Sequence, residues 1–220
     1  MNRRMSVLFG LALLAAASPA RAGWGLPSAP SASKGGATAA DIDQFLLSAT
    51  KADEFVQHSA VALFKAVGSK EEVEKIKAQI VAAKQIADPK EREAAQQKAI
   101  ADMTKSLQTQ DWEKAKSDLA ASHDADKKNA VKDGIWNLAL GGLMNTEVVA
   151  VGKKIVSGPP DPTVAAKLQE AGSAVDKLVS QGQGLTKVLG GAKQLMTTVG
   201  LQALPAKASD APKAIAGDFP

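Results

Sequence analysis

The sequence has 220 residues, of which 45% are hydrophobic and 23% charged, and it contains no cysteine. The apolar fraction is enough for a buried core, and the lack of cysteine excludes disulfides, thiolate metal sites and a cysteine nucleophile. Most of the formal charge of +4 comes from residues 1–22, which hold three arginines and no acidic residue. The rest of the chain has 24 basic and 23 acidic residues, which excludes the basic surface of a nucleic-acid-binding protein.

Residues 1–22 have the pattern of a signal peptide. A basic start is followed by the apolar run 7–16 and then by small residues, with Ala20 and Ala22 at the −3 and −1 positions of a cleavage site. The apolar run is too short to serve as a membrane anchor. We therefore expect a periplasmic or secreted protein, cleaved near Ala22-Gly23 and without a stable transmembrane anchor.

Composition divides the remainder into three parts. Residues 23–37 are mostly Gly, Pro, Ser and Ala, which is typical of a flexible leader, and residues 205–220 have the Ala/Pro/Lys/Asp composition of a disordered tail. Between them, apolar residues recur with the helical period and no strand pattern occurs. Residues 38–204 are therefore predicted to form one helical bundle domain.

Capping signals mark the first helices. The first helix is expected to begin near Thr38 or Asp41. It is expected to end before Gly68, since glycine suits the C′ position that follows a helix. Ser69 with Glu72 three residues later forms a capping box, which predicts the start of the second helix. In the pair Asp88-Pro89, aspartate suits the N-cap and proline the first position of a third helix, which reaches about Gln110. A shorter helical piece around Trp112 either continues it or stands alone.

The fourth helix, about 126–157, is apolar on all sides between residues 134 and 151. Such a helix lies at the centre of its fold, or else it meets an apolar ligand or a membrane. Trp136, Leu140, Leu143 and Glu147 are the candidate ligand-binding residues. Since a carboxylate inside a bundle needs a partner, we also expect Glu147, Asn145 and Trp136 to form a polar spot in the interior. The alternative is that Glu147 simply reaches solvent beside Lys154.

The last helix is predicted over 163–204, capped by Asp161-Pro162 and ended by Pro205. Glycines at 182, 184, 190 and 191 weaken a helix and favour a bend or break there. The inward positions follow a strict heptad register; they are Val164, Leu168, Ala171, Val175, Leu178, Gly182, Leu185, Leu189, Ala192, Met196 and Val199.

Short connections between these helices make consecutive ones antiparallel neighbours. The predicted fold is therefore all-α, an elongated up-down bundle of four to six helices around one core, with a long heptad-patterned C-terminal helix. His58 and His123 lack the spacing of a ferritin-like or His-Glu-x-x-His metal site. We predict no catalytic residue, no metal site and no cofactor, and hence no enzyme.

The leading function is a non-enzymatic binding or scaffolding module of the cell envelope that acts through helix–helix contacts. The long heptad helix would supply the surface for self-association or for an envelope partner protein. The alternative is a carrier of a lipid or other apolar ligand, held between helices that are rich in alanine and glycine. A weaker alternative is a bundle that contacts membrane through its fourth helix.

Overall fold

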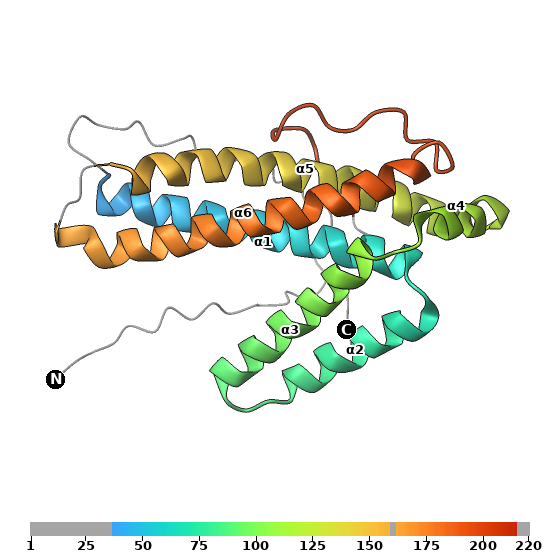
Figure 1. The fold of residues 1–220 in the computed structure, drawn as a ribbon, viewed down its shortest axis with the longest axis horizontal. Helices are drawn as coiled ribbons and strands as arrows, with labels where there is room; N and C mark the ends of the chain where they lie inside the picture. Colours follow the sequence, from blue (N-terminus) through green and yellow to red (C-terminus); the bar gives the residue numbers. More distant parts are fainter. Residues whose placement is uncertain (1–36, 159–161, 215–220) are drawn as a thin grey trace.

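The computed structural model describes residues 37–158 and 162–214, so the expected signal peptide and most of the leader lie outside the described residues. The described chain is all-α, and its six α-helices build an elongated bundle, which confirms the predicted fold class (Figure 1). The elements in chain order are α1 (Ala39–Val67), α2 (Lys70–Lys84), α3 (Pro89–Gln108), α4 (Trp112–Ala121), α5 (Ala125–Val156), the 3₁₀ helix η1 (Pro162–Val164), α6 (Ala165–Ala192) and the 3₁₀ helix η2 (Lys193–Leu195).

The expected helix starts are confirmed. Thr38 caps α1 in a capping box with Asp41, and Ser69 caps α2 in a second one. The side chain of Asp88 accepts hydrogen bonds from two backbone N–H groups at the start of α3, which has proline in its first turn. The piece around Trp112 is a helix of its own, because Asp111 caps it by accepting from a backbone N–H. The proposed cap Asp161 lies outside the described residues.

Three long helices, α1, α5 and α6, lie side by side and form the body of the molecule (Figure 1). The chain runs along α5 in the opposite direction to α1 and α6, as expected for an up-down bundle. Helices α2 and α3 pair into a hairpin that leans away from the body, and α4 lies at one end. The structure is thus a three-helix body with a projecting hairpin, so not every helix joins the same bundle.

Helix α5 is central to the body, as its all-round apolar pattern indicated. Glycines on α5 allow α1 to approach closely. The spacing in residues between successive glycines on α5 equals the spacing between the residues that face them on α1, counted in the opposite direction because the two helices are antiparallel. A Cβ atom at any of the three glycines would press on the facing residue of α1; the facing pairs are Gly134 with Leu63, Gly141 with Val56 and Gly152 with Phe45.

Helix α6 ends at Ala192, so the predicted helix to residue 204 is too long. Two further turns follow, and the chain reverses at Gly200, whose φ of +65° is left-handed. The N–H of Leu201 donates to the carbonyl of Met196, and that of Gly200 to the carbonyl of Thr197, which is a Schellman motif. In the sequence, Gly200 was the residue that could have indicated the C-terminal end of this helical segment. Gly68, predicted at the C′ position of α1, is instead its C-cap residue and has an extended backbone with φ of −65°.

Of the predicted bend or break between residues 182 and 191, a break does not occur, because α6 is continuous across all four glycines. Tertiary contacts offset the weak helix propensity at two of them. The amide of Gln108 lies against Gly184, and the indole of Trp112 lies directly on Gly191. The predicted inward positions Ala171, Val175, Leu178, Leu185 and Ala192 are buried, but between the last two Val188 is buried in place of the half-buried Leu189.

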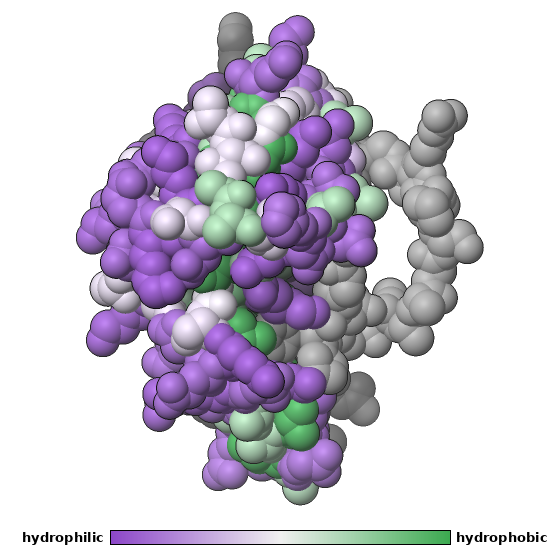
Figure 2. Space-filling model, turned by 90° about the vertical axis from the view of Figure 1, so that its right-hand side faces the viewer, coloured by the Kyte–Doolittle hydropathy of each residue, from purple (hydrophilic) through white to green (hydrophobic). Residues whose placement is uncertain are grey.

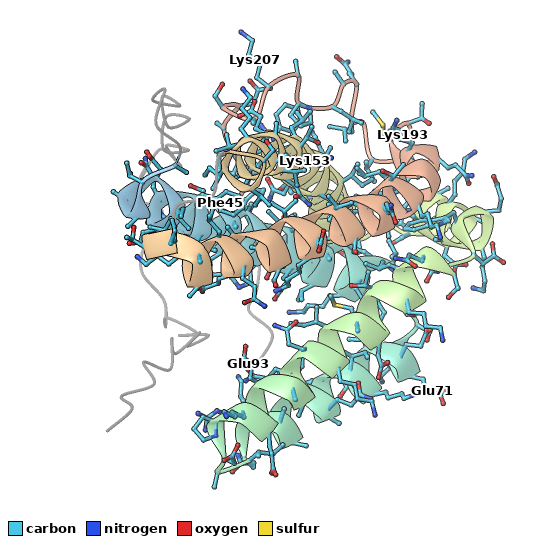
Figure 3. The ribbon with its side chains drawn as sticks, turned by 60° about the vertical axis from the view of Figure 1, so that its left-hand side comes forward. Phe45, Glu71, Glu93, Lys153, Lys193 and Lys207 are labelled. Atoms are coloured by element: carbon cyan, nitrogen blue, oxygen red, sulfur yellow. The ribbon has the colours of Figure 1, made fainter. Side chains whose placement is uncertain are left out.

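The buried side chains form three clusters and not one core. The largest joins all six α-helices of the described chain with the turns that follow α6. A second joins the start of α1, the end of α5 and the first half of α6, with Phe45 inside the body (Figure 3). The third and smallest contains Phe55, Leu140, Met144 and Ala208. Within the described ranges, no helix has the length and hydropathy needed to cross a bilayer.

Candidate functional site

Trp136, Leu140 and Leu143 lie on one side of α5, as their spacing predicts. Leu140 is buried, and the other two are half-buried. What covers them is the chain itself: residues 205–214, which we call the strap, run back over α5 (Figure 1). Residues 208, 211 and 213 of the predicted tail thus make defined contacts with the body, while residues 215–220 lie outside the described chain.

The strap places one small side chain in an apolar pocket of the body. Ala208 is 5% exposed and packs against Phe55 of α1 and against Leu140, Leu143 and Met144 of α5. The turn that presents it is closed by Asp210, whose carboxylate accepts from the backbone N–H groups of residues 206 and 207. These two hydrogen bonds lower the pKa of Asp210. Ala208 thus lies in a turn that Asp210 closes.

Polar contacts fix the end of the strap to α5. The fully buried amide of Asn137 donates to the carbonyl of Lys213 (2.9 Å) and accepts from the N–H of the same residue (2.8 Å). The indole N–H of Trp136 donates to the carbonyl of Ala211 (3.1 Å), and the ammonium of Lys213 lies 5.0 Å from the centre of the indole ring. Asp133 is one turn away, and burial raises its pKa, while Lys132 and Lys213 oppose that shift.

Glu147 does not form the expected interior polar spot, because its side chain is exposed. The buried polar residues of α5 are Asn137 and Asn145. The amide of Asn145 donates to the carbonyl of Leu178 (2.9 Å) and to the side chain of Gln181 (3.1 Å). Within the described chain, its Oδ1 atom is buried without a hydrogen-bond partner. A pattern that is apolar all round could not indicate which side of α5 meets solvent.

Asn145 is one end of a polar network that joins the three helices of the body. Gln181 of α6 accepts from Asn145 and donates to the carboxylate of Asp53 on α1 (2.8 Å). Lys177 of α6 pairs with the same carboxylate at 2.6 Å, where the side chain of Asp53 is 14% exposed. The network leads from the interior of the body to the surface beside the hairpin, where the cleft described next opens.

A cleft of about 520 Å³ lies between α3 of the hairpin and the α1–α6 side of the body; we call it the hairpin cleft. Its floor is aliphatic and includes Val56, Ala60, Leu185 and Val188. Around the floor are amide and hydroxyl side chains together with Lys105 and the Asp53–Lys177 pair; they are Gln57, Gln97, Gln108, Gln181, Thr104 and Ser180. This combination of an apolar floor and polar edges is typical of a binding groove.

A second, smaller cavity of about 310 Å³ is lined by residues of α1, α2, α3, α4 and α5. Glu72 lines it and accepts from the hydroxyls of Ser69 (2.6 Å) and Ser106 (2.7 Å). These hydrogen bonds, that of Ser69 first, lower the pKa of Glu72. Because the carboxylate is already engaged as a helix cap, we assign the cavity a structural role.

The face of the molecule at the α4 end is largely polar (Figure 2). Seen from the end at which α4 lies, most of the molecule is hydrophilic, with a narrow hydrophobic strip and a small patch at the foot of the view, where the hairpin is (Figure 2). His58 and His123 are both exposed. Among the residues that the structure describes, no group of three His, Cys, Asp or Glu side chains could hold a metal ion.

Comparison with known proteins assigns no relationship to this chain. No protein-family model, no curated protein and no solved structure matches it. Its function must therefore be inferred from the two features described above, the hairpin cleft and the face of α5 under the strap.

Proposed function

We propose that the protein is an exported, non-enzymatic binding module of the cell envelope, which takes a helix of a partner protein into the hairpin cleft. The observation that carries this proposal is the cleft itself, whose walls are α1, α3 and α6. A fourth helix lying there would complete a bundle with the hairpin and the body. The signal-peptide pattern of residues 1–22 supports location in the envelope.

The lining of the cleft suits an amphipathic helix. The aliphatic floor would receive the apolar stripe of such a helix, as in helix-in-groove recognition. The glutamine amides at the edges can both donate and accept hydrogen bonds, so they suit polar side chains on either flank of the stripe. Lys105 is exposed and adds a positive charge at the α3 edge, which favours an acidic residue of the partner beside it.

The heptad seam of α6 is a poorer candidate surface than the sequence suggested. Its positions Ala171, Val175 and Leu178 are already buried, packed with side chains of α1 and α5. A partner could use the seam only if it displaced a helix of the body. We therefore place the helix–helix contact of the binding module at the hairpin cleft.

A lipid carrier is supported less well. The small residues of α5 leave no room for a lipid against α1, since Leu63, Val56 and Phe45 fill the space beside the three facing glycines. An apolar ligand would have to lie in the hairpin cleft. We also do not propose that α5 contacts a membrane, because α1, α6 and the strap cover it.

The test is native mass spectrometry of the protein purified without detergent from the envelope of cells that make it. Ala101 lines the cleft and is exposed, so Ala101→Trp would fill the cleft without disturbing the core. Ala78 is equally exposed on α2 and is not part of the cleft, so Ala78→Trp is the matched control.

The expected result is a complex with another protein that forms with the wild type and with Ala78→Trp, and is lost with Ala101→Trp. A discrete small mass on a monomer, removed by Ala101→Trp, would instead favour the carrier. A complex unaffected by Ala101→Trp would contradict binding at the cleft. The N-terminus of the same preparation tests export, because cleavage at the expected site leaves Gly23 first.

A further inference from the structure

We propose that the face of α5 under the strap is a binding site for an extended peptide of a partner protein, and that residues 205–214 occupy it as a built-in competitor. This site is separate from the hairpin cleft. Figure 3 places Lys207 of the strap on the opposite side of the molecule from Glu71 and Glu93 of the hairpin. Peptide binding at this face of α5 can therefore be tested independently of helix binding at the hairpin cleft.

Asn137 recognises backbone and not a particular side chain. Its amide pairs with both the N–H and the carbonyl of one residue, Lys213, at 2.8 and 2.9 Å. The amide is fully buried, and its partner lies 76 residues away in the chain. An asparagine in that position provides a hydrogen-bonding edge for any extended segment that reaches it, because one donor and one acceptor of the peptide are satisfied together.

Selectivity would come from the apolar pocket and from the indole ring. The pocket between Phe55, Leu140 and Met144 accepts the methyl group of Ala208. Five residues further along the strap, the ammonium of Lys213 lies over the ring of Trp136. The ligand class is therefore an extended peptide with a small apolar residue followed, five positions later, by a basic residue.

The strap has the features of an exchangeable segment. It contains no helix or strand, and most of its side chains are exposed, with Pro205 and Ala208 as its buried residues. Its end is held by side chains of α5 and not by a hydrogen-bonded ladder. Segments of this kind open locally without unfolding the rest of a protein. When the strap opens, Trp136, Asn137 and the pocket become available together.

The experiment measures binding of a fluorescent peptide that has the sequence of residues 205–214, Pro-Ala-Lys-Ala-Ser-Asp-Ala-Pro-Lys-Ala. The protein variants are full-length. Ala208→Glu places a charge where the pocket is apolar, so it releases the strap and leaves every groove residue unchanged. The double variant Ala208→Glu with Asn137→Ala also removes the backbone-pairing amide.

Ala208→Glu is expected to bind the peptide at least tenfold more tightly than the wild type, whose own strap competes at an effective concentration on the order of millimolar. The double variant is expected to lose this gain, and a peptide carrying glutamate in place of Ala208 is expected not to bind. Equal binding by the wild type and Ala208→Glu, with circular dichroism showing both folded, would overturn the proposal.

A second measurement keeps the proposal testable if Ala208→Glu fails to fold. Lys213→Pro removes the N–H that pairs with Asn137 and changes no residue of the body. It is expected to speed hydrogen exchange at the indole N–H of Trp136 by at least tenfold and to strengthen peptide binding. Unchanged exchange would overturn the proposal. A wild-type dimer that Lys213→Pro abolishes would also overturn it, since the occupant would then be the strap of a second copy.

Discussion

The contact of Gly152 with α1 and α6 provides a direct test of the packing within the three-helix body. A Cβ atom on Gly152 would lie 2.5 Å from Val175 and 2.5 and 2.6 Å from two ring atoms of Phe45. Ordinary carbon–carbon contacts are about 3.5–4.0 Å, so a methyl group would intrude by about 1 Å on two sides. Both neighbours are buried, Phe45 at 2% exposure and Val175 at 7%.

Two opposing effects decide the result of Gly152→Ala. Alanine is the better helix former by about 1 kcal/mol. Overpacking a well-filled core costs about 1–3 kcal/mol. Because the new methyl group would meet side chains on two sides, we expect a cost near the upper end of this range. We therefore expect the free energy of unfolding to fall by about 1–2 kcal/mol and the Tm to fall by roughly 2–8 °C for a domain of this size.

The matched control is Gly172→Ala on α6, where a Cβ atom would meet nothing within 4 Å. The propensity gain acts alone there, so we expect stabilisation by up to about 1 kcal/mol. The assay is urea unfolding followed by circular dichroism at the helix band, with all variants measured side by side. If Gly152→Ala proved as stable as Gly172→Ala, the close approach of α1, α5 and α6 would be refuted.

Three further predictions concern polar residues. Ser69→Ala is expected to lower the free energy of unfolding by about 1 kcal/mol at pH 6. Because the pKa of Glu72 is lowered in the folded protein, this loss should shrink as the pH falls through about 4.3 and below. A loss that does not change with pH in urea titrations would contradict the cap. Asp53→Ala should cost about 1–3 kcal/mol, since it leaves Gln181 without its acceptor, whereas Asp43→Ala, which breaks an exposed pair with Lys167, should change stability by less than about 1 kcal/mol in the same assay. Glu147→Leu should change the Tm by no more than the equivalent of about 0.5 kcal/mol, and a larger change in a thermal melt would show that Glu147 has a partner.

Local signals in the sequence were sufficient for most helix starts. The caps at Thr38, Ser69 and Asp88 depend on side chains within three residues of the backbone groups that they satisfy, so the pattern alone identifies them. The end of α6 was missed because the heptad register continues to Val199. The local signal for the reversal is Gly200, where the chain turns with a left-handed backbone, and Pro205 lies beyond it.

The site was predictable only in part. The spacing of Trp136, Leu140 and Leu143 places them on one side of a helix, but periodicity cannot say what covers that side. An Ala/Pro-rich tail has the composition of a disordered segment, and the strap is ordered by Asn137, a residue 76 positions earlier. The hairpin cleft likewise depends on the angle at which α3 leans from the body, which is set by contacts between distant parts of the chain.

The matched steps of α1 and α5 also constrain the order in which this protein can fold. Gly134 and Gly152 are synthesised roughly 70 to 110 residues after their α1 partners, which at about 5–20 residues per second is a delay on the order of ten seconds. The α2–α3 hairpin closes within its own sequence and can form during that interval. Helix α1 is therefore made first, and the side of it that packs on α5 stays uncovered until α5 has been synthesised.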